Sequence, residues 1–337
     1  MDIDKTSPLY QDLRSLTSKY GAALMIELVN YIFVAALIFI AAGVFCGLTG
    51  IDMNSGSGAG YLVSMLVNDI ASYAFPIAVF YAMFKKDIEA ADLMLSLAGD
   101  EMKYRRFTGE TILLLLAGLF MASTGSLATS IVSGFLNDLF SVPEPQTAFS
   151  DSMPPGVFEF VTFEIASVIV APICEELIYR HLLLKPLRRY SDMTAAVVSA
   201  MIFGISHFNF DQFLYTFFFG FALAVITMRS GSIVPAVICH MANNLIAGMT
   251  VYMPETFGSD ILDSLFGTLA SLCSTLSVLM FWAGIPATVI VLVSKLARLK
   301  SASYVPVKTQ FAVMFSQLFV ILGLAASLVL TFLLLYR

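Results

Sequence analysis

The feature that most constrains this chain is a succession of long apolar runs that contain few charged residues. A bilayer core requires about 20 consecutive apolar residues for each helical span. We predict about nine such spans, and at least eight, with the bounds 22–48, 59–84, 108–135, 157–184, 193–210, 212–228, 232–252, 264–294 and 310–336. Only 12% of the residues are charged, about half the share of a soluble domain, which is too few to cover a water-facing surface. The predicted fold class is therefore an all-α, polytopic membrane helical bundle.

The basic residues indicate how this bundle is oriented. Lysines and arginines precede the first predicted span, lie between the second and third, follow the fourth and the sixth, and lie between the eighth and ninth. All these connections fall on one side of the membrane, and basic residues mark the cytoplasmic side. The opposite connections hold only acids, such as Asp52, Glu144 and Glu255. We therefore predict that the N-terminus is cytoplasmic.

We divide the chain into four parts by these patterns. They are a cytoplasmic N-terminal segment (1–21), N-terminal transmembrane helices (22–150), a helical core that carries the chemistry (151–252) and C-terminal transmembrane helices (253–337). Within the first part, residues 7–20 have the pattern of a short amphipathic helix on the cytoplasmic headgroups, with Ser7 as its cap and Pro8 in its first turn. A loosely ordered tail is the alternative.

Two adjacent glutamates lie inside the predicted fourth span, in the sequence APICEELIYR (171–180). Each ionisable residue in a span costs about 2.5–3.5 kcal/mol on insertion scales, so such residues usually have partners and a function. Glu176 and Arg180 are four residues apart and can pair on one helical face. Glu175 points about 100° away and has no such partner, which favours a role as a proton acceptor. Alternatively, both acids only bind neighbouring helices.

Two histidines lie in later predicted spans. His207 ends the sequence FGISH, and His240 lies in GSIVPAVICHMANN (231–244). His240 and Asn244 are four residues apart, so they share one helical face. A lone intramembrane histidine is usually a packing residue, but two imidazoles together with a carboxylate favour a site.

These residue types are the parts that a hydrolase needs. Glu175 with His207 can hold and deprotonate a water molecule, and His240 with Asn244 can donate hydrogen bonds to the oxyanion that forms on the attacked carbonyl. Two histidines and a glutamate are also a workable zinc set with one position open for water. The compact HExxH motif is absent, so the spacing alone does not demand a metal.

The three segments together resemble the motifs of the CPBP family, which comprises the CAAX proteases and the bacteriocin-processing, Abi-type proteins. EELIYR is similar to the EExxxR motif, FGISH to the FxxxH motif, and GSIVPAVICHMANN to the HxxxN/B motif with its preceding Gly-Ser turn. Their order and spacing also fit, and the resemblance covers about 155–250. It implies an intramembrane endopeptidase whose site opens toward the cytoplasm, and which acts either as a metalloprotease or by a metal-independent glutamate mechanism.

The resemblance also implies roles for particular residues. It assigns Glu175 and His207 to the activation of water, His240 and Asn244 to the stabilisation of the oxyanion, and Glu176 and Arg180 to support. If the enzyme uses a divalent metal such as zinc, the implied ligands are Glu175, His207 and His240.

The predicted function is the hydrolysis of a peptide bond in a membrane-associated peptide or protein tail. The expected substrate is a leader-bearing peptide such as a bacteriocin precursor, or a short C-terminal tail near the membrane; prenylated CAAX tails rank second. The expected partners are membrane lipid and this substrate, with no nucleic acid. We expect a multi-pass protein of a bacterial plasma membrane.

Three other interpretations compete with this prediction. The chain could be a non-catalytic immunity or scaffold protein of the same family. It could be a proton- or cation-coupled transporter, because acids such as Asp69 and Glu164 also lie in predicted spans, although no paired halves with broken helices are present. It could be a cysteine peptidase, because Cys174 and Cys239 directly precede the key acid and imidazole. One step along a helix, however, turns a side chain about 100° away.

The depths of the three central residues conflict in a bundle of straight helices. Counted from the cytoplasmic surface, Glu175 lies about 15 Å deep, His207 about 21 Å and His240 about 12 Å. Either the stretch 186–195 dips inward, or the predicted fifth span begins deeper than its apolar pattern indicates.

Overall fold

The computed structural model describes residues 5–50, 58–97, 108–140, 156–208, 210–294, 299 and 305–335 of the 337-residue chain. These residues form α-helices and π-helical turns (η), with no strand among them. The N-terminal elements are α1 (Pro8–Val29), η1 (Asn30–Val34), α2 (Ala35–Thr49), α3 (Gly58–Asp69), η3 (Ile70–Ala74), α4 (Phe75–Leu97) and α5 (Gly109–Phe140). The central elements are α6 (Val157–Glu164), η5 (Ile165–Val170), α7 (Ala171–Glu176), η6 (Leu177–Leu183), α8 (Leu184–Leu187), α9 (Asp192–Ile205), α10 (Phe210–Ser230), α11 (Val234–Ala247) and η7 (Gly248–Tyr252). The C-terminal elements are α12 (Asp260–Val293), α13 (Val307–Phe315) and α14 (Leu318–Leu335).

The described helices confirm an all-α membrane bundle, and the chain is an integral membrane protein. Seven helical runs are long and apolar enough to cross a membrane, or eight if α13 and α14, which meet at a 71° bend, count as one span. The sequence predicted about nine. The difference is α9, which was expected to be the fifth span. It has 14 residues, or a length of about 21 Å, which is shorter than a hydrocarbon core of about 30 Å.

The first helix corrects the prediction for the N-terminal segment. Ser7 does cap this helix, because its hydroxyl accepts from the Tyr10 backbone N–H at 3.3 Å, and Pro8 begins it. The helical run then continues without a break to Thr49, a length of about 63 Å. Residues 8–20 are therefore neither a separate interfacial helix nor a loose tail. They extend the first span well beyond the thickness of a bilayer core.

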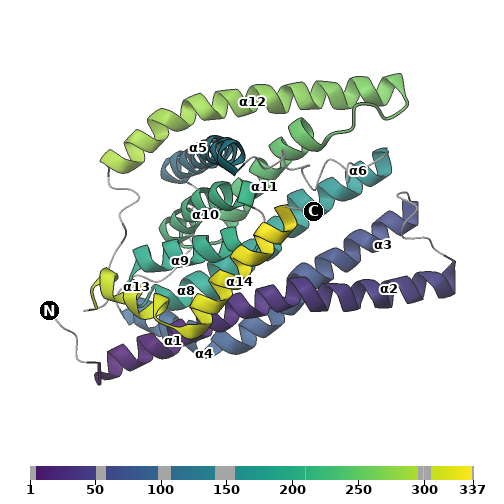
Figure 1. The fold of residues 1–337 in the computed structure, drawn as a ribbon. Helices are drawn as coiled ribbons and strands as arrows, with labels where there is room; N and C mark the ends of the chain where they lie inside the picture. The colour runs from purple at the N-terminus through teal and green to yellow at the C-terminus, as the bar shows by residue number, and fades with distance from the viewer. Residues whose placement is uncertain are drawn as a thin grey trace.

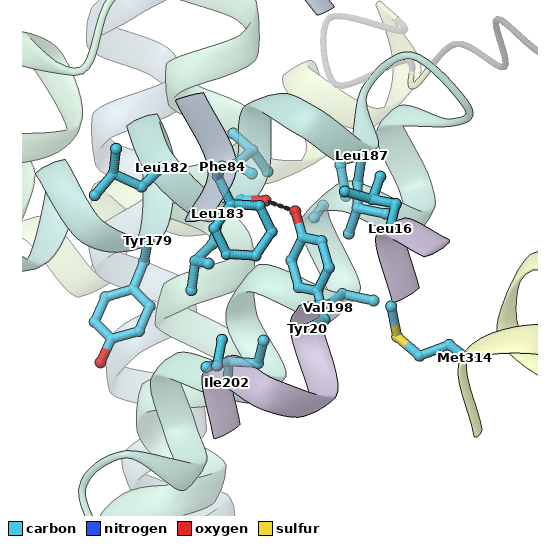
Figure 2. Close-up of a cluster of buried hydrophobic side chains, with 14 of the residues drawn as sticks. Leu16, Tyr20, Phe84, Tyr179, Leu182, Leu183, Leu187, Val198, Ile202 and Met314 are labelled. Carbon is cyan, nitrogen blue, oxygen red and sulfur yellow. Dashed lines mark hydrogen bonds between the residues drawn. The ribbon is translucent and has the colours of Figure 1, made fainter. Parts of the chain in front are cut away.

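This N-terminal extension packs onto the central elements. Leu16 and Tyr20 of α1 lie beside Leu183 and Leu187, and the Tyr20 hydroxyl donates to the Leu183 carbonyl (Figure 2). The N-terminal half of α1, the end of α4, α8 and α13 gather at one end of the bundle (Figure 1). Ion pairs join these elements as well, since Lys19 of α1 contacts Asp87 of α4 at 2.6 Å.

The run from α6 to α9 lies between two groups of helices (Figure 1). On one side are α1 to α4, and on the other are α5, α10 and α12, of which α5 contacts both α10 and α12 (Figure 1). A second apolar cluster, which includes Leu114, Phe219, Leu223 and Cys239, joins α5, α10 and α11. The run from α6 to α8 keeps one exposed apolar face, on which Ile173 of α7 is 48% exposed, whereas Glu176 on the same helix is fully buried.

Five π-helical turns occur among the described residues, at η1, η3, η5, η6 and η7. A π-turn widens the helix locally and is frequent at functional sites. Backbone carbonyls in these turns accept side-chain hydrogen bonds from other elements. The four acceptors and their donors are Ala71 (from Asn30, 2.7 Å), Ser167 (from Asn244, 2.9 Å), Tyr179 (from Ser199, 2.7 Å) and Leu183 (from Tyr20). The backbone carbonyls of the π-turns therefore accept hydrogen bonds that fix one helix against the next.

Candidate active site

Glu175 lies on α7 at the centre of a polar cluster that draws on three separate parts of the chain. Its Oε1 accepts a hydrogen bond from the Tyr73 hydroxyl of η3 at 3.0 Å. Its Oε2 lies 3.6 Å from Nε2 of His240 on α11. The side chain is 14% exposed, so the carboxylate is held on both sides yet is not sealed off. A carboxylate in such a position can accept a proton from a water molecule.

Glu176 is fully buried and connects His240 to Arg180. Its Oε1 lies 3.0 Å from His240 Nδ1, and its Oε2 lies 3.0 Å from Arg180 Nε. The pair with Arg180 is the one that the four-residue spacing predicted. It is a close ion pair without the alignment of a hydrogen bond, since neither atom finds a hydrogen-bond partner. The Arg180 guanidinium also lies 4.9 Å from the centroid of the Phe203 ring, which adds a cation–π contact.

His240 is positioned from several directions. Glu175 lies near its Nε2 and Glu176 near its Nδ1. Its ring packs edge-on against Phe203 and Phe219 at centroid distances of 5.8 and 5.4 Å. Only 4% of the residue is exposed. These contacts leave the imidazole little freedom to rotate.

His207 follows the end of α9, and its orientation is set by a backbone carbonyl. Its Nδ1 lies 2.8 Å from the Phe203 carbonyl oxygen. A carbonyl can only accept, so Nδ1 carries a proton and Nε2 of the neutral ring keeps its lone pair. The Glu175 carboxylate and the His240 ring are both close enough to act electrostatically on His207. The rings of His207 and His240 both pack edge-on against Phe203, at centroid distances of 5.0 and 5.8 Å, so His207 lies near the cluster.

Asn244 lies one helical turn beyond His240, and its amide is already engaged. Nδ2 donates to the Ser167 carbonyl of η5 at 2.9 Å, and Oδ1 accepts from Asn243 Nδ2 at 3.2 Å. An amide nitrogen carries two hydrogens, so one remains after the bond to Ser167. The structure therefore joins Asn244 to the neighbouring helix and gives no direct contact between it and Glu175.

Sequence reasoning missed three residues near this cluster. Tyr73 contacts Glu175 directly, as described above. Glu27 of α1 is buried and close enough to interact with both Glu175 and Tyr179. Tyr179 itself donates to the Ser206 hydroxyl at 2.7 Å, just before His207. The available signal was an acid inside the first apolar run, at position 27, which the sequence analysis did not single out.

The implied zinc ligands do not form a metal site in this arrangement. Among the described residues, no three side chains of the His, Cys, Asp and Glu types come together as a set that could hold a metal ion. Glu175 and His240 approach each other, and Nδ1 of His240 contacts Glu176 while Nδ1 of His207 contacts a carbonyl, so Nε2 of each ring is the nitrogen that could hold a metal. We therefore derive no step through a metal, and the metal-dependent and metal-independent mechanisms both stay predictions.

Cys239, one of the two cysteines in the competing cysteine-peptidase interpretation, points away from the Glu–His cluster. Cys239 is buried and contacts α5, where its thiol lies 3.7 Å from the Leu115 carbonyl. Its neighbour His240 points instead toward the glutamates of α7. This opposition of adjacent side chains is what the helical turn of about 100° predicts.

A further acid, Glu164, lies on the same side of α11 beyond Asn244. It is 9% exposed, and neither of its carboxylate oxygens has a hydrogen-bond partner in the described structure. It packs against Gly248, where an added Cβ would lie 1.9 Å from Oε1. A groove between η7 and α12, lined by residues such as Met249 and Ser271, lies outside the Glu–His cluster.

The fold and this site define a class: an integral membrane protein of helices with a buried carboxylate–imidazole cluster suited to hydrolysis. Residues 158–246 match the family model described as Rce1-like, type II CAAX prenyl endopeptidase Rce1-like. The match confirms the predicted resemblance to the CPBP family and supports, at the family level, an intramembrane endopeptidase of the CAAX type. No curated protein and no solved structure gives a significant match to the chain.

Proposed function

We propose that the protein hydrolyses a peptide bond in a membrane-associated peptide or protein tail, with Glu175 as the base that activates water. The contact that carries this proposal is the approach of Glu175 Oε2 to His240 Nε2 at 3.6 Å, beside the fully buried Glu176–Arg180 pair. The description of the matching family favours a C-terminal, CAAX-type tail as the substrate. A bacteriocin precursor and a bacterial plasma membrane remain predictions from the sequence.

The charges of the cluster suit this chemistry. Two carboxylates face one arginine, and an imidazolium at His240 makes the set of Glu175, Glu176, Arg180 and His240 electrically neutral. Neutrality lowers the cost of keeping charged groups in a medium of low dielectric constant. Glu176 then orients His240 through Nδ1, which leaves the Nε2–H of the imidazolium as a donor toward the reacting carbonyl.

The reaction follows from these positions. A water molecule held by the Glu175 carboxylate and Nε2 of His207 loses a proton to Glu175 as its oxygen bonds to the scissile carbonyl carbon. The oxyanion accepts hydrogen bonds from His240 Nε2–H and from the remaining amide hydrogen of Asn244. When the C–N bond breaks, Glu175 returns its proton to the departing amine. The products are a carboxylic acid and an amine, and the Glu175 carboxylate is regenerated.

The test uses the full-length protein in detergent or proteoliposomes with two substrates, a prenylated CAAX-type peptide and a leader-bearing peptide. We expect Glu175→Gln, His207→Ala and His240→Ala each to lower kcat about 100-fold or more while the protein still inserts. The matched control is Cys174→Ala, one residue from Glu175, which should retain kcat within about twofold. Full turnover by Glu175→Gln in mass-spectrometric assays would refute the assigned roles, whereas loss of activity in Cys174→Ala would favour the cysteine-peptidase interpretation.

A further inference from the structure

One contact to the cluster comes from outside the segment that matches the family model. Tyr73 belongs to η3, in the second long helical run, whereas the match begins at residue 158. Its hydroxyl donates to Glu175 Oε1 at 3.0 Å. The N-terminal helices therefore do more than enclose the central elements, because they supply a hydrogen-bond donor to the proposed base.

We propose that Tyr73 is a positioning residue for the hydrolysis, and that its hydroxyl holds Glu175 with Oε2 turned toward His240. This inference rests on the proposed function. A carboxylate has two oxygens, and a donor fixed on Oε1 sets the direction of Oε2. The side chain of glutamate has three rotatable bonds, so without such a donor it can adopt other rotamers.

Tyr73 is itself held in place by the neighbouring helix. Asn30 of η1 donates to the Ala71 carbonyl at 2.7 Å, two residues before Tyr73. Both η1 and η3 are π-helical turns, so the two helical runs meet at their irregular turns. The Tyr73 ring also packs against the main apolar cluster. The hydroxyl is thereby fixed by contacts on two sides before it reaches Glu175.

The other described contacts of Glu175 do not replace this donor. His240 Nε2 approaches the opposite oxygen, Oε2, at 3.6 Å. Arg180 is near, but it pairs with Glu176. Among the described contacts of Glu175, Tyr73 is thus the hydrogen-bond donor that opposes displacement of the carboxylate from the region of His207 and His240. It acts on Glu175 and makes no contact that assigns it to the substrate.

The test is Tyr73→Phe, which removes one hydroxyl and keeps the ring. We expect kcat to fall about 10- to 100-fold, the usual effect of losing a hydrogen bond to a charged group, with KM unchanged within about twofold. The matched control is Tyr81→Phe in the same helical run, whose ring is half-exposed, and its kcat should equal that of the wild type. A thermal melt of each variant checks that the fold is intact.

A second variant protects the test against a folding defect. Asn30→Leu keeps the Tyr73 hydroxyl but removes the bond to the Ala71 carbonyl, and we expect kcat to fall a few-fold. Wild-type kcat in Tyr73→Phe would overturn the inference, and so would an equal loss in Tyr81→Phe. Absence of cleavage by the wild-type protein would instead overturn the proposed function itself, so the two failures are distinguishable.

Discussion

Arg180 offers the sharpest test of how the cluster is stabilised. Its side chain is completely buried, its Nε lies 3.0 Å from Glu176 Oε2, and its guanidinium lies over the Phe203 ring. Arg180→Ala removes the positive charge and leaves the buried Glu176 carboxylate with only the His240 ring beside it. Breaking a buried pair in this way costs about 3–5 kcal/mol, several times the value of an exposed pair. We expect lower yield, lower activity and a midpoint of thermal unfolding that falls by on the order of 10 °C.

The loss of charge can be separated from the loss of volume. Arg180→Met keeps most of the side-chain volume and should be nearly as unstable as Arg180→Ala, because Glu176 still lacks the charge of the arginine. The double variant Glu176→Gln/Arg180→Met removes both charges, and replacing a whole buried pair is often neutral. We expect the double variant to recover most of the lost stability, although its activity should stay low because Glu176 no longer offers His240 a charged partner.

The matched control for this experiment is Lys185→Ala. Lys185 pairs with Asp92 at 2.6 Å, a shorter distance than in the Arg180 pair, but the Asp92 side chain is 52% exposed. Water can solvate Asp92 once its partner is lost, so the expected cost is below about 1 kcal/mol. An unfolding midpoint of Arg180→Ala equal to that of Lys185→Ala, in the same detergent, would refute the argument from burial. A double variant no more stable than Arg180→Met would refute the argument from charge.

Two further predictions concern the neighbouring acid and the metal. Gly248→Ala should lower the unfolding midpoint and kcat, because the new Cβ would lie 1.9 Å from Glu164 Oε1 and must displace either this carboxylate or η7. The control is Gly267→Ala, where a Cβ meets nothing within 4 Å. Equal midpoints for the two variants would contradict the packing argument. Removal of metal ions with a chelator should leave kcat within about twofold, because the described His, Cys, Asp and Glu side chains form no three-ligand group; loss of activity that zinc restores would show that Glu175, His207 and His240 rearrange around a metal.

The local relations in the site were predictable from the sequence because helical spacing fixes them. Glu176 and Arg180 pair as their four-residue separation requires, and Cys239 points away from the face of His240 as its single-residue separation requires. The spacing could not show that His240 would lie between the two glutamates. That arrangement depends on how α11 packs against α7, which is a tertiary relation.

The depth conflict shows how tertiary packing altered a prediction from straight spans. Residues 182–192 are all buried, so the turn between α8 and α9 lies inside the protein rather than at its surface. The N-terminal half of α1 packs on this region, as the bond from Tyr20 to the Leu183 carbonyl shows. The short helix α9 therefore begins within the protein, and the rings of His207 and His240 both pack against Phe203 near its end. The apolar pattern of 193–210 gave a span of ordinary length and could not reveal this covered start.

The π-helical turns explain why the contacts of Glu175 were beyond sequence analysis. Such a turn adds a residue without changing the apolar pattern, so the sequence reads as one straight helix. Yet η5 and η6 flank α7 directly, and η3 carries Tyr73. Each turn rotates the helix that follows it, so the side chains that meet at Glu175 depend on the turns as much as on the residue types. In the second helical run, the position of the Tyr73 hydroxyl beside Glu175 therefore depends on η3, which no apolar pattern in the sequence indicates.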